Sequence, residues 1–328
     1  MRQALVWGVG VVSVVLALPA QADTLARGQG VAAAFLRGEV GAIWAEMTPD
    51  MQRAIGAPEH LAALRGKVET DFGHEEEVLS EQVVRQGGHS VFTREARWSG
   101  FSQPVRLLVA FDQNNRIAGF WIGAVPVAAP SAHLNYETKA RLRLPFEGAW
   151  HVVWGGREIE QNYHAIDAGQ RFALDLLVLK EGRSHAGDPA DLENYHCWGR
   201  PILAPADAVV ANAVDDLPDQ KIGQSDPRNP LGNHVVLDFG NGEYGFLAHL
   251  KQGSVRVAKG DRVTSGMEIG RCGNSGNTSE PHLHFHLQNS PLFGQGEGLP
   301  AQFVNYHAGD ALVERGEPTK GQTVQAAE

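Results

Sequence analysis

The chain of 328 residues has only two cysteines, and after residue 18 it has no apolar run long enough to cross a bilayer. It also has fewer Lys and Arg than Asp and Glu, 28 against 38, which gives a formal net charge of −10. This acidic balance argues against nucleic acid as a partner. The helical His-Glu-x-x-His motif of many metalloproteases is absent. With 43% hydrophobic residues the chain can bury a sizeable core, and its length predicts about two domains.

The N-terminus is rich in the features of an export signal. Arg2 supplies a positive charge, an apolar run follows to Leu18, and Ala20-Gln21-Ala22 has the small-x-small pattern of a cleavage site. We predict a signal peptide over residues 1–22 and an exported protein that is periplasmic or secreted. An uncleaved membrane anchor is the alternative, although the run is short for a membrane span.

The two cysteines, Cys197 and Cys272, lie 75 positions apart. In an oxidising compartment they favour a disulfide that ties distant parts of one domain together. Two buried free thiols, or a thiolate zinc ligand, are the alternatives.

Residues 23–128 predict a smaller α+β domain, because helical spacing comes first and alternating strands follow. The strands are expected at 78–85, 90–98, 105–111 and 117–125. The layout weakly resembles the cone-shaped domains of the nuclear transport factor superfamily. No residue here forms a catalytic constellation, so we expect a docking, regulatory or spacer role, with a protein regulator as its partner.

A linker is predicted at 129–145, and a second domain at 146–308. The second domain has short apolar runs punctuated by glycine, proline, asparagine and aspartate, which indicates mainly antiparallel β structure. Two long polar segments, 181–194 and 215–232, are candidates for the walls of a cleft. The polar tail 309–328 lacks periodicity and is expected to be disordered. The strands of this domain are expected at 150–154, 172–178, 202–203, 209–210, 234–239, 244–250, 254–257 and 282–288.

The most informative stretch of this domain is Pro281-His282-Leu283-His284-Phe285-His286-Leu287, in which histidines alternate with apolar residues. Alternation of this kind predicts a half-buried strand with three imidazoles on one face. Same-face residues lie about 6.6 Å apart along a strand, so two of them can converge on one ion. A His-x-His pair on a surface strand is the simpler alternative.

Three further residues could meet that face. Asp175 lies in an otherwise apolar strand, where a carboxylate must be paired or coordinate a cation. His249 lies in another apolar strand, and His164 lies in a polar approach to Asp175. Each has a structural alternative, as a buried hydrogen bonder, a core histidine or a loop residue. Together with His282 and His284 they supply what a catalytic zinc site needs.

Several segments carry a resemblance over residues 146–305. The chain resembles the lysostaphin-type zinc metallopeptidases, also called LytM-domain peptidoglycan endopeptidases. The matching segments are Arg171–Asp175, Pro201–Asp207, Gly232–Asp238, Leu247–Leu250, Val263–Gly270 and Gly273–Gly276, leading into Pro281–Phe285.

The resemblance implies that Asp175 and His284 are zinc ligands and that His249 and His282 are the catalytic histidines. The family usually has a histidine four residues before the aspartate, but Arg171 stands there and cannot deprotonate to bind a metal. His164, eleven residues before Asp175, is therefore assigned as the first ligand. The alternatives for this position are His151, His185 and His196. The family often has glutamate where His286 stands, so His286 is expected beside the site.

The implied function is zinc-dependent hydrolysis of peptide bonds in peptidoglycan stem peptides or cross-links, with one Zn²⁺ per chain. A zinc-activated water would attack, assisted by His249 and His282, whose roles the sequence does not divide. One alternative is a catalytically inactive LytM-like regulator that activates a cell-wall amidase. Another is a secreted protease that acts on proteins.

Overall fold

The computed structural model describes residues 19–327, which form two compact units, one ending at Val125 and the other beginning at Pro126. The predicted signal peptide falls mostly on residues 1–18, which lie outside the described residues. Its last four positions lie in α1 (Pro19–Leu36). None of the helices among residues 19–327 combines the length and the apolar character that a bilayer crossing requires.

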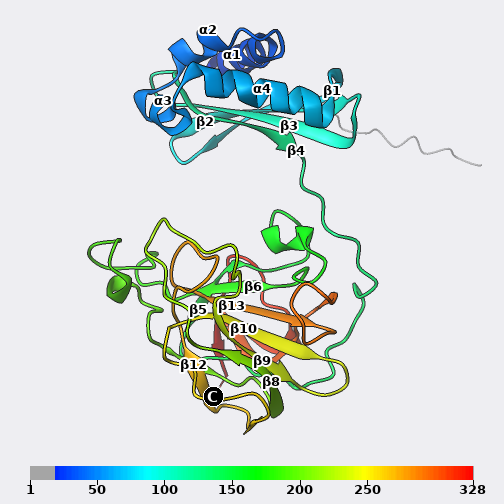
Figure 1. Cartoon of the computed structure of the whole chain (residues 1–328), viewed down its shortest axis with the longest axis vertical. Coiled ribbons are helices and arrows are strands. Elements are labelled where there is room, and N and C mark those ends of the chain that lie inside the picture. Colours follow the sequence, from blue (N-terminus) through cyan, green and yellow to red (C-terminus); the bar gives the residue numbers. More distant parts are fainter. Residues whose placement is uncertain (1–18, 328) are drawn as a thin grey trace, which may run out of the picture. The chain divides into compact units, whose positions relative to one another are not determined.

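The first unit pairs helices with one antiparallel sheet, so the predicted α+β architecture is confirmed (Figure 1). The sheet order is β1-β2-β3-β4, and the predicted strands are found within a few residues of their expected bounds. The elements are α1, α2 (Val40–Glu46), α3 (Pro49–Ile55), α4 (Pro58–Phe72), β1 (Glu75–Gln86), β2 (His89–Trp98), β3 (Phe101–Phe111) and β4 (Ile117–Ala124).

Local sequence signals set the helix boundaries of this unit. Thr48 caps α3, because its hydroxyl accepts a hydrogen bond from the Met51 amide and Pro49 follows at the first turn. Helix α4 also starts at a proline and buries Leu61 and Val68. Figure 1 shows α4 lying along one face of the sheet. The resulting core is separate from that of the second unit.

The second unit is built mainly from antiparallel strands, as predicted. Its large sheet has the order β11-β8-β9-β10-β13-β6-β5-β17-β15-β16, with β14 beside β13, and β7 pairs with β12 separately. The strands are β5 (Trp150–Trp154), β6 (Leu174–Leu177), β7 (Pro201–Leu203), β8 (Ala208–Val214), β9 (Asn233–Asp238), β10 (Tyr244–Leu250), β11 (Arg262–Val263), β12 (Glu268–Arg271), β13 (Leu283–Gln288), β14 (Gly298–Leu299), β15 (Phe303–Ala308), β16 (Ala311–Gly316) and β17 (Thr323–Ala326). Two short 3-10 helices, η1 (Tyr163–Ile166) and η2 (Leu192–Asn194), lie in the loops.

Alternation along β13 divides the two faces of this sheet. Leu283, Phe285 and Leu287 are fully buried in the main core with residues of β6, β9 and β10. Burying each such side chain contributes about 1.5–3 kcal/mol. The intervening histidines lie on the opposite face. Cys197 and Cys272 form the expected disulfide, which ties the loop after η2 to the chain just after β12.

The predicted linker at 129–145 is wrong, because most of this segment packs on the second unit. Leu142 and Leu144 belong to its main core. The buried Glu243 carboxylate accepts hydrogen bonds from Tyr136 Oη at 2.9 Å, Lys139 N at 2.5 Å and Ala140 N at 2.7 Å. A buried carboxylate needs hydrogen-bond donors, and residues 136–140 supply them, so Glu243 fixes this segment to the second unit.

The predicted disordered tail at 309–328 is also wrong for the described residues, which extend to 327. Strand β16 pairs with β15, and β17 is inserted between β15 and β5. Val324 is fully buried. The tail has few apolar residues, so its composition does not indicate strands. The strands with which it pairs lie far away in the sequence. The strand predicted at 254–257 does not form.

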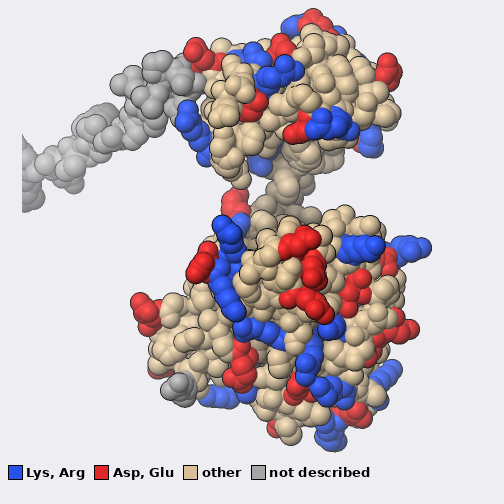
Figure 2. Space-filling view, turned by 90° about the vertical axis from the view of Figure 1, so that its left-hand side faces the viewer, with Lys and Arg blue, Asp and Glu red and all other residues tan. Residues whose placement is uncertain are grey.

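The acidic excess of the chain does not produce an acidic face in the view of Figure 2. Lys and Arg lie close to Asp and Glu on both units there. Net charge alone therefore says little about the surroundings of any one site.

Candidate metal centre

Two of the predicted ligands are placed by strand pairing. Asp175 on β6 lies directly opposite His284 on β13 in the antiparallel register. Their side chains share one face of the sheet, and His284 Nδ1 lies 2.9 Å from Asp175 Oδ1. The alternation of polar and apolar residues in the sequence therefore predicts correctly that Asp175 and His284 meet.

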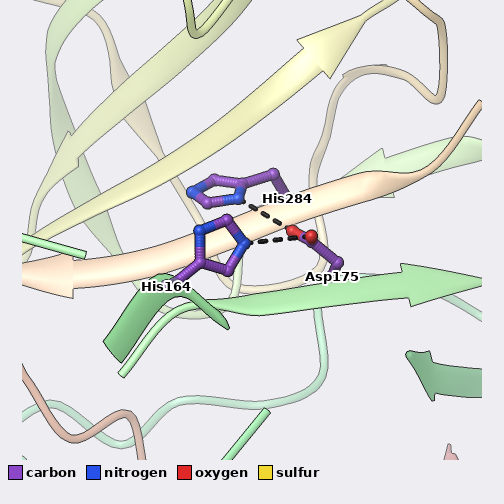
Figure 3. Close-up of side chains that lie close together, drawn as sticks. All are labelled: His164, Asp175 and His284. Carbon is purple, nitrogen blue, oxygen red and sulfur yellow. Dashed lines mark hydrogen bonds and ion pairs between the residues drawn. The ribbon is translucent and has the colours of Figure 1, made fainter. Parts of the chain in front are cut away.

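The third residue, His164, comes from η1 rather than from a strand. Its Nε2 lies 3.0 Å from Asp175 Oδ2, and Figure 3 shows both imidazoles directed at the carboxylate. Asn162 caps η1 by accepting a hydrogen bond from His164 N at 3.2 Å. The same side chain donates to Gly156 O and Ala173 O, at 3.1 and 3.0 Å, and is fully buried.

Arg171 occupies the usual family position of the first ligand but does not join the group. Its guanidinium donates to Arg157 O at 2.7 Å and lies over the Phe172 ring. The loop between Arg157 and Arg171 is thereby fastened at both ends, and its middle carries His164 to Asp175. The sequence analysis missed Asn162, although an asparagine just before a short helix is a capping signal.

Within the described range 19–327, His164, Asp175 and His284 form the one cluster of at least three His, Cys, Asp or Glu residues suited to a metal ion. One ligand atom from each lies within 4.8 Å of the other two, and all three residues are buried. The fallback ligands His151, His185 and His196 lie outside this group. Two imidazoles and one carboxylate are the donor set of a catalytic zinc site with an open fourth position.

The electrostatics of Asp175 fit a cation site. Burial alone would raise the pKa of this carboxyl, but the neighbouring His164 and His282 outweigh it and hold the pKa well below its usual range. Asp175 is therefore a buried anion at neutral pH. Such a charge is tolerated only when cationic or hydrogen-bonding groups compensate it.

The two predicted catalytic histidines lie beside this group. His249 Nδ1 is 2.8 Å from Ser275 O, and His282 Nδ1 is 2.8 Å from Glu280 O. An imidazole that donates from Nδ1 to a carbonyl keeps Nε2 free for other chemistry. The two rings have centroids 4.7 Å apart, and His282 Nε2 lies 3.6 Å from Asp175 Oδ1.

The surroundings of these two histidines shift their pKa values in opposite directions. Burial, followed by the neighbouring His282 and His284, holds the pKa of His249 well below its usual range. Burial also disfavours the imidazolium of His282, but the Asp175 carboxylate outweighs burial, so the pKa of His282 is raised. His249 has a φ of 59°, a left-handed conformation that is uncommon for residues other than glycine. Backbone outliers of this kind are often found at functional sites.

His286 contacts the ring nitrogen of His284 that does not face Asp175. Its Nδ1 lies 2.9 Å from His284 Nε2, and its ring stacks on Phe246 with centroids 4.4 Å apart. A partner on the second nitrogen fixes the orientation of a metal-binding imidazole. This arrangement matches the expected place of His286 beside the site.

Both long loops contact segments next to the site, and their role as the walls of a cleft stays a prediction. Ser184 Oγ donates to the Glu280 carboxylate at 2.6 Å, just before β13. The second loop lies against the turn at 273–277, where Asn277 N donates to Pro230 O. A Cβ on Gly232, whose φ is 57°, would lie 2.3 Å from the Ser275 backbone. Glycine is therefore required where this loop meets the turn.

The comparisons with known proteins agree with this site. Residues 191–297 match the model of peptidase family M23. His249, His282 and His284 lie inside the matched residues, whereas His164 and Asp175 precede them. The family region is therefore completed by an intact His/Asp metal-binding group.

Individual relatives cover only parts of the chain. It is 41% identical to the peptidoglycan DD-endopeptidase ShyA of Vibrio cholerae serotype O1 over 56 residues, which are 17% of this chain and 13% of that protein. It is 30% identical to endolysin 2638A of Staphylococcus phage 2638A over 141 residues, covering 36% and 28% of the two chains. This chain thus spans less than a third of the length of each curated relative.

Among solved structures, the chain is similar to the catalytic domain of lysostaphin from Staphylococcus simulans. The identity is 20%, the TM-score is 0.28, and the match covers 45% of this chain and 86% of that one. The M23 metalloprotease pseudoalterin matches with 16% identity and a TM-score of 0.32, over 52% of this chain and 82% of that one.

Proposed function

We propose that this protein is a zinc-dependent endopeptidase that hydrolyses peptide bonds in peptidoglycan stem peptides or cross-links. The observation that carries the proposal is the buried His164–Asp175–His284 group with two further histidines beside it, in a chain whose residues 191–297 match family M23. The name of the relative ShyA, a peptidoglycan DD-endopeptidase, supports the substrate class.

Zinc is the proposed ion because the donor set suits it. His164 and His284 would bind through nitrogen and Asp175 through oxygen, and the anionic carboxylate would offset part of the charge. When bound, zinc would supply a polarising charge for a water molecule and for the scissile carbonyl. The contact between His286 and His284 Nε2 would hold the His284 imidazole with Nδ1 toward the ion.

The protein's own proton chemistry would fall to His249 and His282. Both have Nδ1 beside a backbone carbonyl, so each would present Nε2 to the substrate. One would accept the proton of the attacking water, and the other, as imidazolium, would donate a hydrogen bond to the oxyanion. No glutamate base of the His-Glu-x-x-His type is needed in this arrangement.

We also propose that the protein acts outside the cytoplasm, in the periplasm or after secretion. The disulfide between Cys197 and Cys272 supports an oxidising compartment, and the predicted signal peptide supports export. A role as a non-hydrolytic amidase activator is disfavoured, because such a role would not need the intact donor set. The first unit remains a proposed docking or regulatory module.

The test is digestion of purified sacculi, with mass analysis of the released fragments. The wild-type protein should release peptides in the presence of zinc, and His284→Ala should release none. A protein substrate such as casein, incubated in parallel, separates a peptidoglycan enzyme from a general protease. Absence of any zinc-dependent release from sacculi would overturn the proposal.

A further inference from the structure

An apolar pocket of about 280 Å³ lies on the second unit, and one of its lining residues, Phe246, stacks on His286 next to the metal group. Val236 and Phe246 form its floor. The loop that precedes β9 forms one wall, and the segment after β13 forms another. The apolar wall residues include Leu217, Leu231, Leu292 and Phe293.

The strand register places this pocket on the same sheet face as the metal group. Phe246 pairs with His286 across β10 and β13, and Val236 pairs with Phe246 across β9 and β10. His286 and His284 are two residues apart on β13 and so share a face. Neighbouring strands lie about 4.8 Å apart, so the pocket floor at Val236 is about 10 Å from the strand of His284.

The apolar floor of the pocket does not belong to the main core. Val236, Phe246, Ala248 and Leu231 form a separate buried cluster, whereas Val235, Leu237 and Leu247 face the main core on the other side of the sheet. At the rim Leu292 is 55% exposed. Apolar surface left open beside a polar centre is the usual composition of a ligand subsite.

One cationic side chain completes the pocket. Arg228 is the single Lys or Arg among its lining residues, and no Asp or Glu lines it. The Arg228 side chain is 91% exposed, and its Nε lies 3.6 Å from Asp226 Oδ1. Such a long ion pair at the surface is weak, so the guanidinium remains free to bind another carboxylate.

We propose that this pocket binds a long aliphatic side chain that ends in a carboxylate, with Arg228 as the specificity-determining residue. This inference rests on the proposed function and names its substrate class. The apolar walls would cover the methylene stem, and Arg228 would bind the terminal carboxylate. Stem peptides with diaminopimelate carry such a side chain. The last carbon of the diaminopimelate side chain bears an amino group as well as this carboxylate. A lysine side chain has the same stem and amino group but lacks the carboxylate, so it offers Arg228 no partner.

The experiment compares two synthetic cross-linked muropeptides that differ only in diaminopimelate or lysine at the stem's third position. The zinc-loaded wild-type protein should cleave the diaminopimelate substrate with a kcat/KM about threefold to tenfold higher, mostly through KM, as expected for one exposed charge-assisted hydrogen bond. Arg228→Gln should abolish this preference by slowing only the diaminopimelate substrate. Leu292→Ser should slow both substrates, because both have an aliphatic stem.

The matched control is Arg262→Gln on β11, which removes the same charge from an exposed position outside the pocket. It should leave the preference unchanged. Equal cleavage of the two substrates by the wild type, or a preference that survives in Arg228→Gln, would overturn the inference while leaving the peptidase intact. Cleavage of neither substrate would overturn the proposed function itself, and this inference with it.

Discussion

The metal centre has a strand-borne part and a loop-borne part, and they differ in how the sequence specifies them. Asp175 and His284 face each other across β6 and β13, where register alone brings them together. His164 depends on η1 and on the buried side chain of Asn162. The comparison teaches that a strand ligand needs only correct pairing, whereas a loop ligand needs its own local support.

The largest expected effect comes from removing the loop-borne ligand. If His164 is a full member of the group, His164→Ala should lose zinc and hydrolysis as completely as His284→Ala does. The reason is that Asp175 and His284 alone would bind zinc weakly, because a catalytic zinc site usually has three protein ligands. Zinc content after gel filtration, measured by atomic emission, checks this expectation.

His151→Ala is the matched control, because His151 was an alternative ligand and lies on β5 outside the group. This variant should keep one zinc per chain. Loss of zinc from His151→Ala together with full zinc in His164→Ala would reverse the assignment.

The next effect separates catalysis from metal binding. His249→Ala should retain zinc but lower the hydrolysis rate by about 10²-fold to 10⁴-fold, the usual contribution of a positioned acid or base. The measurement is zinc content and peptide release on the same preparation. If zinc disappears together with activity, His249 is a ligand and the division of roles given above fails.

An intermediate effect tests the support of the loop-borne ligand. Asn162→Ala removes the acceptor for His164 N and two donors to Gly156 O and Ala173 O. Losing a group that orients a metal ligand typically costs 10-fold to 100-fold in metal affinity, so we expect zinc binding to weaken by about that factor. Competition with a chromogenic chelator measures it.

Two further variants help to interpret the result for Asn162→Ala, one as a partial rescue and one as a control. Asn162→Ser keeps an oxygen acceptor for the His164 amide and should recover part of the affinity. Asn194→Ala, at the end of η2 and away from the metal group, should have no effect. An unchanged zinc affinity in Asn162→Ala would mean that the loop holds His164 without this cap.

Much of the fold and most of the site were predictable from sequence, for identifiable reasons. Alternation along residues 282–288 gives the two faces of β13, and an isolated carboxylate in an apolar strand indicates Asp175. The tail strand β17 was not predictable, because its partners β15 and β5 lie far apart in the sequence and only tertiary pairing defines it. The pocket near Arg228 was missed for the same reason, since its walls come from distant loops.

The segment at 136–144, which was predicted to be a linker, also depends on a residue that is distant in the sequence. Its attachment depends on the Glu243 carboxylate, which no local pattern in the segment reveals. Glu243→Ala leaves two amides and one hydroxyl without this acceptor, so we expect a loss of about 2–4 kcal/mol in the free energy of unfolding. Urea denaturation measures the loss, and hydrogen exchange should show the first deprotection at Lys139 and Ala140. Uniform exchange across the unit would contradict this local attachment.

The smallest effect is a pH dependence at the same attachment. Burial, followed by the hydrogen bond to Glu243, raises the pKa of Tyr136 to about 12. An unfolded tyrosine has a pKa near 10, so the folded state holds its proton more tightly. The Tyr136 contribution to stability is therefore complete below about pH 10 and is lost as pH rises toward 12. Tyr136→Phe should be less stable than wild type at pH 8, with the difference shrinking between pH 10 and 11. A difference in unfolding free energy that stays constant over that range would show that the phenol proton is not part of the attachment.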